Sequence, residues 1–216
     1  MRVYIGVGHG GKDPGACAYG NKEKDFALDV CKKMVEILAK SVDAKISRTN
    51  DMYKSVTKKV QECNGSSVDL ALDIHFNAGG GKGIEVYYYS SNKKMRDLAE
   101  HLCDEQEKVG VRNRGAKTGD HLYFVRNTEM DAILIEVGFM DNKEDLIRFD
   151  SKEKREKIAS QLAHSILSYY KIPNVQFDKR IKYRVQLGAY AEKDNAEKML
   201  EELKKHGFKG VIKNAE

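Results

Sequence analysis

Short apolar runs separated by polar turns predict buried strands along the sequence up to residue 137. Residues 2–8 (RVYIGVG) are rich in β-branched side chains and end in glycine, which is typical of a strand inside a sheet. Residues 68–75 (VDLALDIH) and 132–137 (AILIEV) have the same character. The expected strands are residues 2–8, 42–48, 68–75, 83–89, 122–126 and 132–137.

A second pattern, with apolar residues three and four positions apart, predicts helices between these strands. In residues 22–40 the apolar side chains of Phe26, Val30, Met34 and Ile37 would share one helix face. Strands that alternate with helices indicate an α/β fold, with a twisted, mostly parallel sheet of about six strands flanked by helices. The other helices are expected at residues 56–63, 92–109 and 143–170.

The sequence changes character after residue 171. Residues 172–180 contain a proline and several polar residues, and they predict a linker between a main domain (1–171) and a smaller segment (181–216). The smaller segment has the pattern of one β–α–β unit, which is too short to bury a good core alone. Its expected strands are residues 183–187 and 208–212, and its expected helix, residues 195–206, would turn Ala196, Met199, Leu200 and Leu203 inward.

The composition is globular rather than disordered or membrane-spanning. Hydrophobic residues make up 41% and charged residues 33% of the 216 positions. No apolar run approaches the roughly 18 residues that a membrane span needs. The net charge of +5 favours anionic partners only weakly, and its basic residues are interleaved with acidic ones, so nucleic acid is not an expected partner. The cysteines form no CxxC pair and are expected to be reduced, with Cys31 and Cys103 on core faces of helices.

Three expected strands end near side chains that are capable of chemistry. His9 and His75 lie at the ends of two of them, and Glu136 interrupts the apolar run of a third. Ligands of open α/β sheets bind beyond the carboxyl ends of the strands, so these groups should meet at one edge of the sheet. Two imidazoles there indicate zinc. Each also fits a structural role, as a loop cap (His9) or a core histidine bonded to backbone (His75).

A catalytic zinc needs a third protein ligand and an open position. Glu23, at the start of the first helix, is a candidate, although a glutamate there also complements the helix dipole. Glu136 is costly in an apolar run unless it is paired or functional. It is therefore either half of a buried salt bridge or a general base acting on a water molecule at the metal.

Five motifs sharpen this interpretation: GHGGKDPG (8–15), KEKDFAL (22–28), SRTND (47–51), DIHFNA (73–78) and IEVGFMDN (135–142). In order and spacing they resemble the zinc-dependent N-acetylmuramoyl-L-alanine amidases of the amidase-3 family, over residues 1–171. The resemblance implies hydrolysis of the amide bond between muramic acid and L-alanine in bacterial peptidoglycan. It also implies one Zn²⁺ bound by His9, Glu23 and His75, with Glu136 as the catalytic residue.

The sequence departs from the usual family motifs at positions that leave these residues intact. Asp73 stands where the family often has serine, and Lys59 where a typical basic residue is arginine. Asn77 and Arg114 lie in expected loops near the crevice and are candidate substrate contacts, although a solvated loop charge explains Arg114 equally well. His121, in the same loop as Arg114, is a weaker candidate ligand.

Residues 183–212 resemble the first half of a SPOR domain, a module that binds peptidoglycan glycan strands. A full SPOR domain has a β–α–β–β–α–β order, and only the first half is present before residue 216. We therefore expect a half SPOR-like wall-binding segment. It is either truncated in this sequence or completed by a second chain in a homodimer.

Two other functions fit parts of the pattern. A zinc peptidase or carboxypeptidase would use similar ligands, but such an enzyme usually has an arginine pair for a terminal carboxylate. A non-catalytic wall-binding module with a structural zinc would prefer four protein ligands, often cysteines, and no cysteine here lies in such a motif. The amidase is therefore the favoured function.

The amino terminus, MRVYIGVGHGG, lacks the apolar core and cleavage site of a signal peptide. We expect synthesis in the cytoplasm without a leader, no membrane insertion, and action on the cell wall. Both a phage endolysin and a bacterial autolysin fit this pattern.

Overall fold

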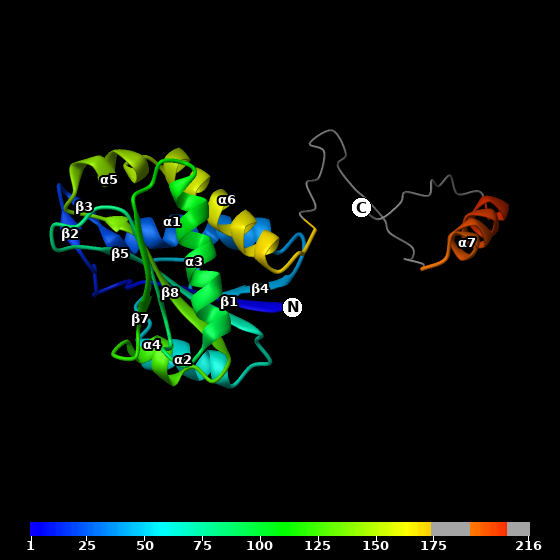
Figure 1. Cartoon of the computed structure of the whole chain (residues 1–216), viewed down its shortest axis with the longest axis horizontal. Coiled ribbons are helices and arrows are strands. Elements are labelled where there is room, and N and C mark those ends of the chain that lie inside the picture. The colour runs from blue at the N-terminus through cyan, green and yellow to red at the C-terminus, as the bar shows by residue number, and fades with distance from the viewer. Residues whose placement is uncertain (174–190, 207–216) are drawn as a thin grey trace. The chain divides into compact units, whose positions relative to one another are not determined.

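The computed structural model describes residues 1–173 and 191–206. The chain divides into two units, Met1–Val175 and Gln176–Glu216 (Figure 1). Within the described residues, no helix is both long enough and apolar enough to cross a membrane. All candidate site residues lie in the first unit.

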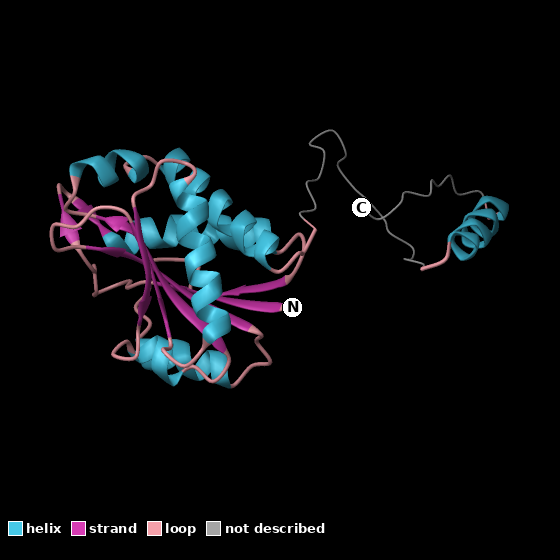
Figure 2. Ribbon diagram, in the orientation of Figure 1, coloured by secondary structure: helices cyan, strands magenta, loops and turns pink. Residues whose placement is uncertain are grey.

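A six-stranded sheet forms the centre of the first unit (Figure 2). Its strands are β1 (Arg2–Val7), β4 (Asp43–Ile46), β5 (Leu70–Asn77), β6 (Ile84–Tyr88), β7 (Asn113–Thr118) and β8 (Asp131–Phe139). In the spatial order β4-β1-β5-β8-β6-β7, the first four strands are parallel, and β6 pairs antiparallel with β8 and parallel with β7. The predicted α/β fold with a mostly parallel sheet is confirmed. A separate ladder pairs β2 (Cys17–Ala18) with β3 (Asn21–Lys22).

Helices cover both faces of this sheet (Figure 1). Side chains alternate between the faces along each strand, so Val3 and Ile5 of β1 join the larger core while Tyr4 joins a smaller one. The larger core lies under α1 (Glu23–Leu38), α3 (Lys93–Glu107), α5 (Lys143–Phe149) and α6 (Lys152–Tyr169), and the smaller one under α2 (Val56–Asn64) and α4 (Tyr123–Asn127).

The same alternation orients β5. Leu72 and Ile74 join the larger core, and Ala71 joins the smaller core beneath α2. Asp73 and His75 follow Ala71 at intervals of two, so they lie on the α2 face of the sheet. This register brings polar groups of β5 within reach of α2.

Besides the unpredicted ladder of β2 and β3, three parts of the fold differ from the sequence prediction. Residues 122–126, predicted as a strand, lie largely in α4, because Phe124 packs into the small core beside α2 and short apolar runs do not distinguish strand from helix. The strand β7 was not predicted, because its sequence NRGAKT is polar and none of its residues is fully buried at the sheet edge. The single helix predicted over residues 143–170 is two helices, and Ser151 caps the second by accepting from the Lys154 amide.

All four cysteines are free, and Cys31 and Cys103 are buried on α1 and α3 as predicted. In the second unit the predicted helix is present as α7 (Lys193–Lys205). No described residue of α7 is fully buried, but Ala196, Leu200 and Leu203 of the predicted inward face are half-buried, and Met199 is exposed. The predicted strands of residues 183–187 and 208–212, and most of the predicted linker, lie outside the described residues.

Candidate functional site

The carboxyl ends of three adjacent parallel strands bring the predicted chemical residues together. His9 follows β1, and His75 lies near the end of β5, the neighbour of β1. The pairing of β5 with β8 sets His75 directly opposite Glu136. Residues far apart in the sequence thus meet at one edge of the sheet, as the strand pattern predicted.

Glu23, the first residue of α1, completes a cluster with the two histidines. Its Oε2 lies 3.0 Å from His9 Nε2, and its Oε1 lies 2.9 Å from His75 Nδ1. The backbone amides of Ala16 and Phe76 donate to the same carboxylate at 2.8 and 2.9 Å and fix its position. One ligand atom from each of the three residues lies within 4.8 Å of the others. Two imidazole nitrogens and one carboxylate oxygen form a donor set that fits a catalytic zinc.

Each histidine has another carboxylate at its outer ring nitrogen. His9 Nδ1 lies 2.8 Å from Asp13 Oδ2, and His75 Nε2 lies 3.3 Å from Asp73 Oδ2. Lys59 of α2 also binds Asp73, with its Nζ 2.6 Å from both carboxylate oxygens. The Asp13 side chain is 42% exposed, whereas Asp73 and Lys59 are buried.

The contacts within the cluster shift the pKa values of its members. Burial favours neutral Glu23, but its hydrogen bonds with His75 and His9 outweigh burial and hold its carboxyl pKa far below the usual range. Burial also disfavours charge on His75, but the charge of Asp73 outweighs burial and raises the pKa of His75 to about 10. The pKa of His9 is raised despite burial by its bond to Glu23. The carboxylates thus favour positive charge at this place, which a divalent cation would supply.

The carboxyl pKa of Glu136 shifts in the opposite direction to that of Glu23. Burial raises the carboxyl pKa of Glu136 to about 7. Its Oε2 is buried and has no hydrogen-bond partner among the residues that the structure describes. The salt bridge that the sequence left open for Glu136 is therefore not present within the described ranges. A buried carboxylate oxygen without a partner is costly, so the place of Glu136 beside the cluster indicates a chemical role.

Comparison with known proteins connects this arrangement to a family. The profile of the N-acetylmuramoyl-L-alanine amidases matches residues 3–168. This chain belongs to that family. A second profile, of the SPOR domain, matches residues 147–214 and therefore overlaps α6 of the amidase fold.

Relatives of this amidase agree with the amidase match. The amidase CwlM of Bacillus licheniformis is 31% identical over 217 residues, which cover 98% of this chain and 84% of CwlM. The endolysin of Bacillus phage SPP1 is 37% identical over 161 residues, which cover 69% of this chain and 59% of the endolysin. The crystal structure of an N-acetylmuramoyl-L-alanine amidase from Clostridium difficile 630 has a TM-score of 0.73 at 30% identity, covering 79% of this chain and 96% of the other.

A further carboxylate of the amidase, Glu85 on β6, gathers four donors. Asn77 and Arg114, the predicted substrate contacts, donate to it at 3.1 and 2.5 Å. Lys117 and the Tyr87 hydroxyl donate at 2.5 and 2.8 Å. The two cations outweigh the single carboxylate, so this group is positively charged next to the strand that holds Glu136.

The positions of these residues correct the sequence interpretation in two ways. Neither predicted substrate contact lies in a loop: Asn77 is the last residue of β5, and Arg114 lies on β7, with its guanidinium 5.0 Å from the ring centre of Phe139. Glu85 was missed, although it interrupts the apolar run GIEVYYY just as Glu136 interrupts AILIEV. His121 lies near Tyr87, with ring centres 6.1 Å apart, and does not belong to the metal-ligand cluster.

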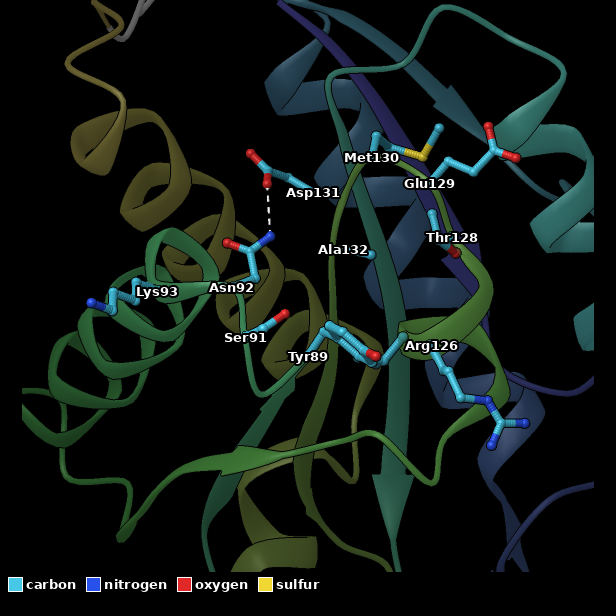
Figure 3. Close-up of a pocket in the computed structure, with 11 residues that line it drawn as sticks. Tyr89, Ser91, Asn92, Lys93, Arg126, Thr128, Glu129, Met130, Asp131 and Ala132 are labelled. Carbon is cyan, nitrogen blue, oxygen red and sulfur yellow. Dashed lines mark hydrogen bonds between the residues drawn. The ribbon is translucent and has the colours of Figure 1, made fainter.

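A separate pocket of about 600 Å³ lies at the other end of β8 (Figure 3). Its lining includes Asp131, the first residue of β8, which accepts a hydrogen bond from Asn92 at 2.9 Å. None of His9, Glu23 and His75 lines this pocket. The candidate active site of the amidase is therefore the histidine–glutamate cluster at the carboxyl edge of the sheet.

Proposed function

We propose that this chain is a zinc-dependent N-acetylmuramoyl-L-alanine amidase that hydrolyses the amide bond between N-acetylmuramic acid and L-alanine in peptidoglycan. The observation behind the proposal is the meeting of His9, Glu23 and His75 beside Glu136, whose buried Oε2 has no hydrogen-bond partner among the described residues. The family profile and the amidase relatives support the choice of bond and polymer.

His9, Glu23 and His75 would hold one Zn²⁺. When bound, zinc acts as a Lewis acid that polarises the amide carbonyl and makes water more acidic. Glu23 suits this role because its pKa is held low and two backbone amides fix its carboxylate.

Glu136 would act first as a general base and then as a general acid. It takes a proton from the attacking water and later gives that proton to the nitrogen of L-alanine as the amide bond breaks. A carboxyl pKa of about 7 suits both steps, because the group can accept and release a proton near neutral pH. The missing partners of Oε2 would then be water and substrate.

Asn77 and Arg114 would contact the substrate from the positively charged Glu85 group. Arg114 keeps 30% of its side chain exposed while it binds Glu85, so it can reach an anionic group of the stem peptide. Asn77 lies on β5, next to the strand of Glu136, and Arg114 lies on β7, which β6 separates from that strand.

Residues 181–216 would bind glycan strands, connected to the catalytic domain (1–171) by the linker 172–180. The SPOR match over residues 147–214 supports wall binding. A homodimer formed through this segment stays a prediction, and light scattering that finds a monomer with an ordered tail would contradict it. The relatives include both a phage endolysin and bacterial amidases. We therefore propose action on the bacterial cell wall, without choosing between a phage and a bacterial role.

The deciding experiment is a digest of purified peptidoglycan with and without a chelator, with the new ends identified by mass spectrometry. We expect free L-alanine amino termini that disappear with chelator and return with added zinc. The Glu136→Gln variant is the matched control, because it should bind zinc without releasing these ends. New reducing sugar ends, or cuts within the stem peptide, would reject the proposed bond.

A further inference from the structure

Asp73 lies in the middle of the sheet, where a carboxylate is costly unless it is paired. It is 1% exposed and occupies β5 two residues before His75. On one side Lys59, 3% exposed, binds both of its oxygens at 2.6 Å. On the other side its Oδ2 faces His75 Nε2 at 3.3 Å. Asp73 therefore connects a helix of the smaller core to one histidine of the cluster.

The two nitrogens of His75 have different surroundings, and this difference determines their roles. Nδ1 faces Glu23 Oε1 at 2.9 Å, inside the candidate metal cluster. A histidine binds a metal through an unprotonated nitrogen, so its other nitrogen carries the proton. A carboxylate bonded to a lysine can only accept a hydrogen bond, so the proton facing Asp73 belongs on Nε2.

We propose that Asp73, held by Lys59, is a positioning residue that fixes His75 with its proton on Nε2 and its Nδ1 directed at the metal. This inference rests on the zinc site proposed above and extends it to two residues outside the ligand set. Asp73 is not one of the three candidate ligands. It acts only through the orientation and protonated nitrogen of His75.

The neighbouring strand is shaped for this arrangement. Gly6 of β1 pairs with Asp73 in the sheet, and a Cβ at Gly6 would clash with the Asp73 carboxylate. A Cβ at Gly8 would come within 2.9 Å of His75 Nδ1. The space that both side chains occupy is therefore provided by two glycines, one on β1 and one just after it.

A purely structural role for the Lys59–Asp73 pair is the competing explanation. Removing one partner would leave a buried charge unpaired and destabilise the fold, which would obscure any effect on the metal. Removing both partners together avoids this problem. The double variant Lys59→Met/Asp73→Leu replaces the pair with apolar side chains, and Lys59→Met/Asp73→Asn retains a neutral acceptor for His75 Nε2.

The first test measures zinc affinity by competition with a chromophoric chelator, alongside thermal melting. We expect Lys59→Met/Asp73→Leu to fold and to bind zinc about 10- to 100-fold more weakly than wild type. Lys59→Met/Asp73→Asn should recover most of that loss. The matched control is Asp29→Asn/Arg155→Met, which removes another partly buried ion pair (2.8 Å) away from the cluster and should leave zinc affinity unchanged. Wild-type zinc affinity in a folded Lys59→Met/Asp73→Leu protein would reject the positioning role.

The second test needs no variant and therefore does not depend on folding. In the zinc-loaded wild-type protein, ¹⁵N chemical shifts of the imidazole of His75 report which nitrogen binds the metal and which carries hydrogen. We expect zinc on Nδ1 and a slowly exchanging proton on Nε2. Zinc on Nε2 would overturn the inference while leaving the proposed amidase intact. A wild-type chain that binds no zinc would reject both.

Discussion

The two histidines of the cluster are held in different ways. His9 lies in a loop after β1 with a left-handed backbone (φ 54°), and its outer partner Asp13 is 42% exposed. His75 lies within a central strand, and its outer partner Asp73 is 1% exposed and paired with a buried lysine. One half of the site is thus supported by a solvated loop and the other half by the interior of the sheet.

This difference predicts where the site is rigid and where it adapts. A solvent-exposed carboxylate adds little stability when it pairs with a nearby group, whereas a buried carboxylate is costly to leave unpaired. The His75 half should therefore keep its geometry in the absence of ligand, and the His9 half should be the part that adjusts. The following predictions test this contrast, from the largest expected effect to the smallest.

The largest expected effect is the loss of hydrolysis when Glu136, the proposed catalytic residue beside both histidines, is replaced. Glu136→Gln removes the proton acceptor while keeping the shape of the side chain. We expect a loss of hydrolysis of about 10²- to 10⁴-fold with zinc still bound, measured by product release and metal analysis. A variant with more than about a tenth of the wild-type rate would contradict the catalytic role.

The melting temperature of Glu136→Gln is a control that shows whether the substitution disturbs the fold. Burial raises the folded-state pKa of Glu136 above the value in an unfolded chain. The folded chain therefore binds this proton more tightly, so stability is lost as pH rises through about 7. At pH 8, zinc-free Glu136→Gln should melt at a higher temperature than the zinc-free wild type. A lower melting temperature would indicate that the substitution disturbs the fold.

Removing either histidine should abolish tight zinc binding, but the two losses should differ in their effect on the fold. His9→Ala removes a loop side chain. His75→Ala leaves the Lys59–Asp73 pair beside a cavity in the sheet, so its melting temperature should fall further. Metal analysis and thermal melting of both variants check this. Full zinc occupancy in either variant would rule out that residue as a ligand.

Activity should depend on pH through Glu136. Because the base must be ionised, kcat/KM should fall by about tenfold per pH unit below the carboxyl pKa, which burial places at about 7 and bound zinc would lower. The profile should therefore rise with pH and level off by about 7. The residual activity of Glu136→Gln should lack this rise, and a wild-type profile with no fall on the acid side would contradict the assignment.

The smallest effect should come from Asp13. Asp13→Asn changes the exposed outer partner of His9, and we expect zinc affinity to fall by no more than about threefold, because solvent screens this contact. Chelator competition, run beside the Lys59→Met/Asp73→Leu protein, measures the contrast directly. Equal losses in the two proteins would remove the distinction between the two halves.

The sequence predicted the part of the site that follows from strand ends. His9, His75 and Glu136 each follow or interrupt an apolar run, and parallel strands bring such positions together. Glu23 depended on the family motif, because a glutamate in a first helical turn has an ordinary explanation of its own. Its contact with His75 spans 52 positions and becomes visible only in the fold.

The outer partners Asp13 and Asp73 were not predicted as partners, although they lie four and two positions from their histidines, because spacing alone does not show which side chains meet. Asp73 and Lys59 were noted only as departures from the family pattern, and nothing in their spacing showed that α2 would bring the two side chains together. The strand β7 was missed for a related reason, since a polar edge strand lacks an apolar alternation. The helix α7 was found because its pattern is local.

The glycines at the end of β1 have a consequence for protein design. Gly6 and Gly8 leave room for Asp73 and His75. The His75 half of the site therefore needs residues from two strands that are distant in the sequence. A designer who grafts the motif DIHFNA into another sheet would place the same side chains against a neighbour that excludes them. To transfer this half of the site, a designer would have to move β1, β5 and Lys59 of α2 together.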